Sequence, residues 1–156
     1  MAVKKRFPGK SAYVACNGGC DSVSCSYGCI GCGKCVSACR FKAIALNAKG
    51  IAEVDQEKCI GCGACARQCP QKIIALHLDA NSIRIRCSNR DKGALARKAC
   101  ALSCIACGIC EKTCTAAAVE VVDNLATIND ELCLSCGMCA VKCPRHAIQD
   151  MKGVLT

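Results

Sequence analysis

The stretch Cys29-Ile-Gly-Cys32-Gly-Lys-Cys35-Val-Ser-Ala-Cys39 decides the fold, because its cysteine spacing occurs four times in 156 residues. Each copy has the form Cys-x2-Cys-x2-Cys-x3-Cys, which is the ligand spacing of a [4Fe-4S] cluster. Three thiolates on one tight loop can bind three corners of such a cluster, so the fourth ligand must come from another segment. The runs begin at Cys29, Cys59, Cys104 and Cys133.

The four runs are expected to work in two interlocking pairs. In two-cluster ferredoxins the last cysteine of each run binds the cluster of the other run. This rule predicts four ligand sets, which are Cys29, Cys32, Cys35 and Cys69; Cys59, Cys62, Cys65 and Cys39; Cys104, Cys107, Cys110 and Cys143; and Cys133, Cys136, Cys139 and Cys114.

The pairing of the runs divides the chain into two modules of the same kind. We expect an α+β fold of two tandem bacterial two-[4Fe-4S] ferredoxin-like modules, with short β-hairpins and short helices around the clusters. The predicted boundaries are a basic N-terminal arm at 1–10, a first module at 11–81, a second module at 82–150 and a C-terminal tail at 151–156.

Apolar segments that follow the runs predict three hairpins, over residues 43–54, 74–86 and 119–128. In the third of these, Asp123-Asn124 is a favoured two-residue turn. A glycine also follows the second cysteine of every run, which predicts a backbone with positive φ that brings N–H groups close to sulfur. These glycines are Gly33, Gly63, Gly108 and Gly137.

Five cysteines lie outside the runs, namely Cys16, Cys20, Cys25, Cys87 and Cys100. Their placement follows the internal repeat, since Cys16 and Cys87 each end an apolar strand and Cys25 precedes Cys29 by the spacing of Cys100 to Cys104. Two interpretations stay open. The five are small buried apolar side chains, or four of them hold a fifth cluster between the halves.

Disulfides and zinc are the alternatives to iron–sulfur clusters for a chain with 21 cysteines. The odd number, the absence of an apolar signal segment and the four regular runs oppose a disulfide framework. A zinc site pairs two Cys-x2-Cys halves and leaves no use for the third and fourth cysteine of a run. Because aromatic residues make up only 3% of the chain, the clusters are expected to serve as core material.

The formal charge of +9 does not indicate nucleic-acid binding. That value treats every cysteine as neutral, whereas an oxidised cluster with four thiolates carries about −2. Four clusters would bring the loaded protein close to about +1, so much of the lysine and arginine offsets the field of the cofactors.

No catalytic constellation accompanies the runs, so we expect an electron carrier rather than an enzyme. His77 and His146 are expected to be structural or exposed, and no nucleotide or flavin fingerprint is present. No run of 18 or more apolar residues occurs, which predicts no direct membrane insertion. Reduced cysteines point to the cytoplasm, including the cytoplasmic face of a membrane through partner subunits.

The stretch Cys87-Ser-Asn-Arg-Asp-Lys-Gly-Ala-Leu-Ala-Arg-Lys-Ala-Cys100, running into Cys104-Ile-Ala-Cys107-Gly, resembles the B subunit of the Rnf complex, a membrane-bound ferredoxin:NAD oxidoreductase coupled to ion pumping. Tyr13-Val-Ala-Cys16-Asn-Gly and Cys25-Ser-Tyr-Gly-Cys29 look like the earlier part of that subunit. The resemblance covers residues 12–150. It implies that the chain accepts electrons from reduced ferredoxin and relays them inward.

The Rnf proteins of this type usually begin with a membrane anchor and a further four-cysteine domain, neither of which these residues contain. A relative that serves another complex is therefore a second interpretation. The chain would then be the iron–sulfur subunit of a hydrogenase, a formate dehydrogenase or an oxoacid oxidoreductase. A third class, cluster storage or redox sensing, would be expected to carry a second binding module, which the sequence does not show.

Reduced ferredoxin or flavodoxin and a larger redox complex are the expected partners. Such carriers are usually acidic, which predicts docking on a basic surface. The candidate docking residues are Arg84, Arg86, Arg90, Lys92, Arg97 and Lys98.

Overall fold

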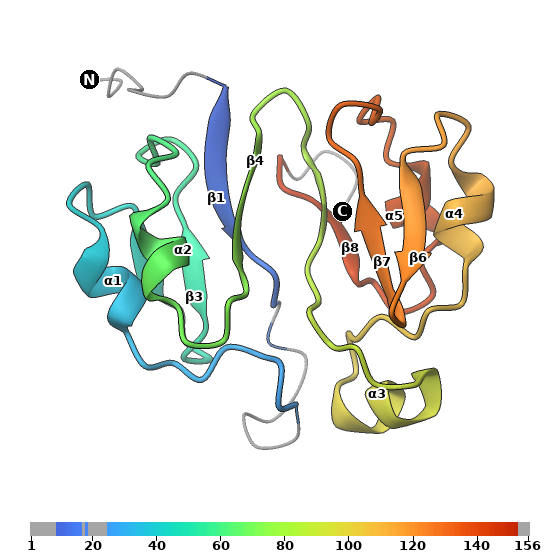
Figure 1. The fold of residues 1–156 in the computed structure, drawn as a ribbon, viewed down its shortest axis with the longest axis horizontal. Coiled ribbons are helices and arrows are strands. Elements are labelled where there is room, and N and C mark those ends of the chain that lie inside the picture. Colours follow the sequence, from blue (N-terminus) through green and yellow to red (C-terminus); the bar gives the residue numbers. More distant parts are fainter. Residues whose placement is uncertain (1–8, 17, 19–24, 153–156) are drawn as a thin grey trace.

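The computed structural model describes residues 9–16, 18 and 25–152, and its elements fall into two halves (Figure 1). The first half contains β1 (Lys10–Val14), α1 (Lys34–Ala38), β2 (Ile44–Leu46), β3 (Ala52–Val54), α2 (Ala64–Gln68) and β4 (Ile74–Leu78). The second half contains β5 (Ile83–Ile85), α3 (Gly93–Ala99), α4 (Ile109–Thr113), β6 (Val119–Val122), β7 (Leu125–Ile128), α5 (Met138–Lys142) and β8 (Ile148–Asp150).

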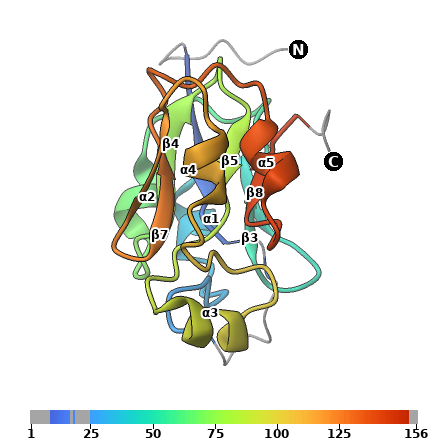
Figure 2. The ribbon, with the colours of Figure 1, turned by 90° about the vertical axis from the view of Figure 1, so that its right-hand side faces the viewer.

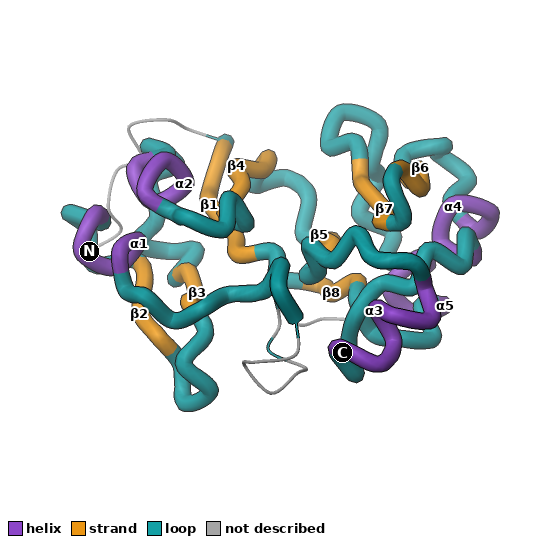
Figure 3. The backbone as a smooth tube through the Cα atoms, turned by 60° about the horizontal axis from the view of Figure 1, so that its bottom comes forward, coloured by secondary structure: helices purple, strands orange, loops and turns teal. Residues whose placement is uncertain are grey.

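Each half contains two antiparallel sheets of two strands. In the first half β1 pairs with β4 and β2 with β3, and in the second half β5 pairs with β8 and β6 with β7. The helices α1 and α2 contact each other at one end of the molecule, and α4 and α5 do so at the other end (Figure 3). The helix α3 lies apart from both pairs, below the second half (Figures 1 and 2).

Two of the three predicted hairpins are confirmed, as β2–β3 and β6–β7. The hairpin over 74–86 is wrong, because β4 pairs with β1 and β5 pairs with β8. Five residue pairs join β1 to β4, with Ala12 opposite Leu76 at the centre. A strand that begins a half therefore pairs with the strand that ends the same half, and residues 79–82 connect the halves instead of closing a hairpin.

The connection between the halves is held by Arg84, whose side chain is buried. Its guanidinium donates hydrogen bonds to the carbonyls of Ile83 (2.6 Å), Leu78 (2.8 Å) and Asn81 (2.6 Å) and forms an ion pair with Asp130 at 3.0 Å. Asp130 also accepts a hydrogen bond from the Leu78 amide at 3.0 Å. These bonds satisfy the polar backbone that a β4–β5 ladder would otherwise have paired.

Each half has its own small core, in which cysteines take the place of larger apolar side chains. The apolar residues five positions after the last cysteine of each run, Ile44, Ile74, Val119 and Ile148, are all buried. Cys35 and Cys65 belong to the first core, and Cys110 and Cys139 to the second. No helix in the described residues is long and apolar enough to cross a lipid bilayer.

Candidate metal centres

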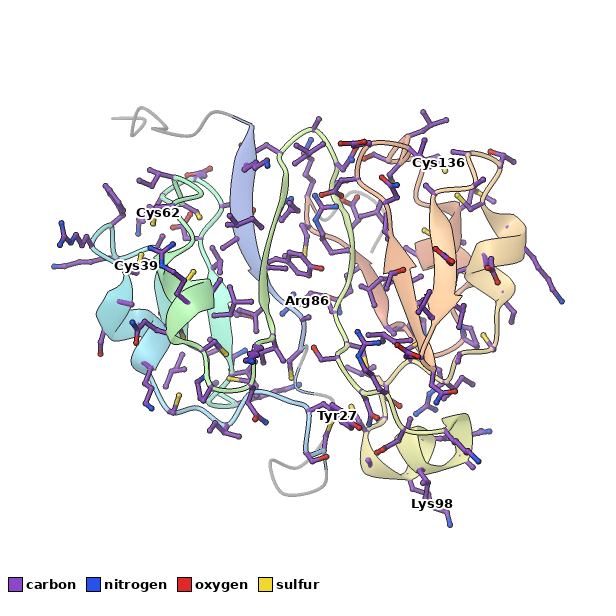
Figure 4. The ribbon with its side chains drawn as sticks, in the orientation of Figure 1. Tyr27, Cys39, Cys62, Arg86, Lys98 and Cys136 are labelled. Carbon is purple, nitrogen blue, oxygen red and sulfur yellow. The ribbon has the colours of Figure 1, made fainter. Side chains whose placement is uncertain are left out.

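Three largely apolar cavities are each lined by cysteines from two different runs. In every case three cysteines of one run meet the last cysteine of its partner run. The sets are Cys29, Cys32, Cys35 and Cys69; Cys59, Cys62, Cys65 and Cys39; and Cys104, Cys107, Cys110 and Cys143. The labelled side chains of Cys39 and Cys62 lie near each other between α1 and α2 (Figure 4).

For the fourth set, cysteines of both runs lie near Cys139. Burial raises the pKa of the Cys139 thiol to about 11, and the neighbouring Cys133, Cys110 and Cys114 contribute to the rise. Cys133 belongs to the same run as Cys139, whereas Cys114 is the last cysteine of the partner run. Cys136, the remaining member, is exposed at the surface.

In the protein without a bound metal group, the third cysteine of each run favours its neutral thiol form. Burial raises the pKa of Cys65 to about 11, and negative charge on Cys59, Cys39 and Cys62 raises it further. Burial likewise raises the pKa of Cys110 to about 11. Crowded thiolates are unfavourable without a positive group among them, so each site suits a cation-rich core that takes up the thiols as thiolates.

Backbone N–H groups point at several of these sulfur atoms. In the second cavity the Ala12 amide donates to Cys59 Sγ at 3.3 Å and the Ala43 amide donates to Cys39 Sγ at 3.4 Å. The Ala118 amide donates to Cys114 Sγ at 3.3 Å, which repeats the contact of Ala43 in the second half. Such donors favour a sulfur that carries negative charge and tune the reduction potential of a cluster bound there.

The predicted left-handed glycines are present in all four runs. Gly33, Gly63, Gly108 and Gly137 have φ between 71° and 75° and directly precede the helices α1, α2, α4 and α5. Each helix carries the third cysteine of its run, so the glycine turns that cysteine back toward the first two. Positive φ costs a side chain about 1–2 kcal/mol, which explains the glycine.

A single metal ion has no site of this kind in the described part of the chain. Among residues 9–16, 18 and 25–152, no three His, Cys, Asp or Glu side chains are placed to hold one ion. A [4Fe-4S] cluster places four thiolates around a larger object. The cysteine-lined cavities, the inward N–H groups and the mutual destabilisation of the thiolates fit that group.

The four described cysteines outside the runs lie at the junction of the halves. Cys16 is buried, and Cys25, Cys87 and Cys100 are half-buried. Burial raises the pKa of Cys87 to about 11, and the thiols of Cys104 and Cys100 add to the rise. Cys20 lies outside the described residues.

Two of the candidate docking residues are not available at the surface. Arg84 is buried in the connection, and Arg86 is half-buried and donates to the carbonyls of Val14 (2.7 Å) and Cys16 (2.8 Å). Arg84 lies on β5 and Arg86 directly follows it. Side chains along this segment point alternately into the core of the second half and toward the first half. The exposed members of the set are Arg90, Lys92, Arg97 and Lys98.

The two histidines have different settings. The His77 ring is buried, packs edge-on against Tyr13 with the ring centroids 5.4 Å apart, and contacts the Leu78 carbonyl and Arg84. Burial lowers the pKa of His77, so the ring is neutral. His146 is exposed and has a positive φ of 53°. Neither lines one of the three cysteine-lined cavities.

Paired cysteine runs of this geometry define a class of iron–sulfur protein, and comparison with known sequences supports the assignment. Residues 23–76, 103–148 and 58–119 each match a family described as a 4Fe-4S dicluster domain. The chain is thus built from tandem 4Fe-4S dicluster ferredoxin domains in a mixed α+β fold. Within that class it is homologous to the B subunit of Rnf-type oxidoreductase complexes.

Two relatives illustrate this homology. The B subunit of the ion-translocating oxidoreductase complex of Methanosarcina acetivorans is 44% identical over 113 residues, which are 72% of this chain and 43% of the relative. The B subunit of the Na(+)-translocating ferredoxin:NAD(+) oxidoreductase complex of Acetobacterium woodii is 41% identical over 95 residues, 61% of this chain and 28% of the relative. The chain therefore spans less than half the length of these relatives.

A further likeness exists to a chain of the formate dehydrogenase, heterodisulfide reductase and formylmethanofuran dehydrogenase complex of Methanospirillum hungatei. It is 24% identical and covers 79% of this chain and 52% of the other. Its TM-score of 0.31 is too low to indicate a shared arrangement of the whole chain.

Proposed function

We propose that the chain relays electrons through four [4Fe-4S] clusters within a ferredoxin-linked, Rnf-type oxidoreductase complex. The proposal takes residues 11–81 and 82–150 as the two modules, and the sixteen run cysteines as ligands in the four interlocked sets. The observation that carries it is the meeting, in one cavity, of three cysteines of a run with the last cysteine of the partner run.

When bound, [4Fe-4S] clusters supply one-electron redox chemistry at low potential. The chain's own residues hold and shield the sulfur atoms. Apolar side chains such as Ile73 and Ile74 line the first cavity beside Cys29, and the Ala52 amide donates to Cys29 Sγ at 3.5 Å. The apolar side chains exclude water and the backbone amides donate to sulfur, and both effects tune the reduction potential of a bound cluster. Neither requires a substrate site.

The outermost cysteines give the sites access to partners. Cys32, Cys107 and Cys136 are exposed, whereas the third cysteine of each run is buried. An electron donor that docks over an exposed cysteine can therefore come close to the cluster bound there. No conformational change of the chain is needed for this approach. This arrangement supports a carrier role.

We place the docking surface for an acidic ferredoxin or flavodoxin around α3. Its basic residues Arg90, Lys92, Arg97 and Lys98 are exposed, and Leu95 adds an exposed apolar side chain among them. Lys98 lies at the outer side of α3 (Figure 4). The homologous complexes translocate ions, so the chain is proposed to associate peripherally with a membrane-bound partner.

Iron counting on pairs of variants tests the cross-ligation. Under the proposal Cys39 and Cys65 serve one cluster, so the Cys39→Ala/Cys65→Ala variant should lose about four iron atoms per chain. Cys35 serves another, so Cys39→Ala/Cys35→Ala should lose about eight. The reverse ranking would mean that each run binds its own cluster. Anaerobic protein with stoichiometric zinc and little acid-labile sulfide would overturn the cluster assignment altogether.

Stopped-flow electron exchange tests the docking surface. Exchange with a reduced ferredoxin should slow as salt rises, because the Debye length falls to about 8 Å at physiological ionic strength. Lys98→Glu should slow it at low salt, whereas Lys34→Glu makes the same charge change on α1 and serves as the control. Equal effects of the two variants would remove α3 as the docking site. Reduction of NAD by the chain alone would contradict the carrier role.

A further inference from the structure

Cysteines outside the runs converge in two pairs at the junction of the halves. In the first half, a Cβ built on Gly28 would lie 3.5 Å from Cys16 Sγ and 3.8 Å from Cys25 Sγ, so these two sulfur atoms flank one glycine. In the second half, Cys87 Sγ accepts a hydrogen bond from the Cys104 amide at 3.3 Å, and Cys104 directly follows the turn that the Ser103 amide closes on the Cys100 carbonyl at 3.3 Å. Each half thus contributes two thiols.

Asn89 joins the two pairs. Its side chain is 1% exposed, and its Nδ2 donates to Cys25 Sγ at 3.7 Å while its backbone amide donates to Cys87 Sγ at 3.4 Å. The Oδ1 atom accepts a hydrogen bond from the Asp91 amide at 2.8 Å, which fixes the orientation of the side-chain amide. One buried residue therefore presents N–H groups to a sulfur of each half.

The chain builds the two pairs by the same local structure. Cys16 follows β1 and Cys87 follows β5. Cys25 accepts a hydrogen bond at its carbonyl from the Gly28 amide at 3.4 Å, and Cys100 accepts one from the Ser103 amide at 3.3 Å. Cysteines that serve only as small buried side chains would not be expected at equivalent positions of both halves.

Two arginines face the same place, and for one of them, Arg86, the Glu53 carboxylate favours the charged form. Arg86 donates to the Cys16 carbonyl at 2.8 Å, and Arg145 donates to the Cys100 carbonyl at 2.9 Å. In the described part of the chain neither forms an ion pair, and the Nε atom of Arg145 is buried without a hydrogen-bond partner. Partly buried guanidinium groups are costly unless negative charge lies nearby. Figure 4 shows Arg86 between the halves.

We propose that Cys16, Cys25, Cys87 and Cys100 bind a fifth [4Fe-4S] cluster at the junction of the halves. The proposal rests on the proposed function, since it assumes that the runs hold clusters. Assembly is a ligand exchange without net redox change. A preformed core enters with four external thiolates, the four protein thiols bind iron, and their protons leave with the four external thiols.

The position gives this site a role in the relay. Cys25 precedes Cys29 by four residues, and Cys87 Sγ accepts a hydrogen bond from the Cys104 amide at 3.3 Å. A cluster here would adjoin a run of each half and sit directly behind α3, whose C-cap is Cys100. It would connect the two modules to each other and to the basic surface.

Iron and acid-labile sulfide of the wild-type chain, isolated anaerobically, give the first test. We expect about 20 iron and 20 sulfide per chain, and about 16 of each after Cys87→Ser/Cys100→Ser. A wild-type chain with about 16 would overturn the fifth cluster and leave the four run clusters standing. Wild-type iron far below about 16, with zinc in its place, would instead overturn the proposed function.

Two single variants test the ligand set independently of how the double variant folds. Cys20→Ser should leave the iron content unchanged, and a loss of about four iron with this variant would overturn the set. Asn89→Asp keeps the acceptor for the Asp91 amide but replaces the N–H donor to Cys25 with an acceptor. It should shift one cluster potential to a lower value, or empty that site, with the other four signals unchanged. A redox titration identical to wild type would contradict the proposal.

Discussion

Replacing Asp130 by Asn should weaken the junction of the two halves far more than the loss of one surface charge would suggest. Asp130 Oδ1 lies 3.0 Å from Arg84 Nη1, and its Oδ2 accepts the Leu78 amide at 3.0 Å. Asn offers a single acceptor oxygen, so its amide nitrogen would face one of these two donors. The substitution therefore loses a hydrogen bond and leaves the buried guanidinium without its counter-charge.

The size of this effect follows from the burial of the pair. The side chain of Arg84 is 3% exposed and that of Asp130 is 25% exposed. Breaking a buried ion pair costs about 3–5 kcal/mol, and the partial exposure of Asp130 reduces this to about 2–4 kcal/mol. Asp123→Asn is the matched control, because Asp123 and Arg90 are 3.8 Å apart with side chains 79% and 47% exposed. An exposed pair of that kind contributes at most about 1 kcal/mol.

The assay is the rate at which cluster absorbance disappears in a fixed concentration of guanidinium chloride under anaerobic conditions, since cluster loss makes unfolding irreversible. We expect Asp130→Asn to accelerate the loss at least about tenfold, because 1.4 kcal/mol corresponds to a factor of ten. Asp123→Asn should change it by less than about threefold. Equal rates for the two variants would refute the assignment of Arg84 and Asp130, which both bond to the Leu78 backbone of the first half, as the residues that hold the halves together.

Three further predictions concern a glycine substitution, the pH dependence of stability and the removal of iron. Gly61→Ala should shorten the half-life of cluster absorbance in denaturant more than Gly33→Ala, because both glycines have positive φ but only at Gly61 would a Cβ lie 2.4 Å from the Lys10 carbonyl oxygen. Burial lowers the pKa of His77, so the unfolded chain binds more protons than the native one below about pH 6.5. Wild-type stability should therefore fall as pH drops through that value, and His77→Phe should flatten the fall in denaturation midpoints measured from pH 7.5 to 5.5. Iron chelation under reducing conditions should abolish the far-ultraviolet circular dichroism of native structure; retention of that signal would show a fold independent of metal.

Much of the architecture could be predicted because it is encoded locally. The spacing within each run, the glycine before the helix of each run and the Asp123-Asn124 turn are short-range signals, and the structure contains the expected left-handed glycines and the β6–β7 hairpin. The pairing of β4 was missed because proximity along the chain favours a hairpin, whereas β1 lies about 60 residues away and its pairing is a long-range choice.

The electrostatic role of individual arginines could not be predicted from composition. Arg84 and Arg86 alternate with Ile83 and Ile85 in the manner of a strand with one solvated face, which predicts exposed arginines. That face is instead covered by the other half, and Arg84 becomes a buried donor to backbone carbonyls. A strand at the junction of two modules has no solvated face. The alternation of polar and apolar residues within a strand does not indicate whether that strand lies at such a junction.

Backbone geometry repeats even where the residue type does not. The position two residues after the first cysteine has positive φ in every run, with Gly31 and Gly61 in the first half but Ala106 and Ser135 in the second. A Cβ at Gly31 would lie 2.8 Å from the Gly50 carbonyl oxygen, so glycine is needed there for packing as well as for φ. Ala106 and Ser135 adopt the same turn at a cost of about 1–2 kcal/mol each.

That cost indicates what stabilises the fold. The described helices have five to seven residues and the sheets only two strands, and elements of that size are marginal on their own. The turns with positive φ oppose a folded chain whether or not metal is bound. The crowded cysteines disfavour thiolates in the protein alone, whereas a cation-rich core stabilises them and gives the inward N–H groups a negatively charged sulfur to bind. Because the last cysteine of each run reaches into the site of its partner, filling one site also positions a ligand for the other. Folding and cluster binding within each half should therefore be a single cooperative process, with the bonds from Arg84 and Asp130 to the Leu78 backbone coupling one half to the next.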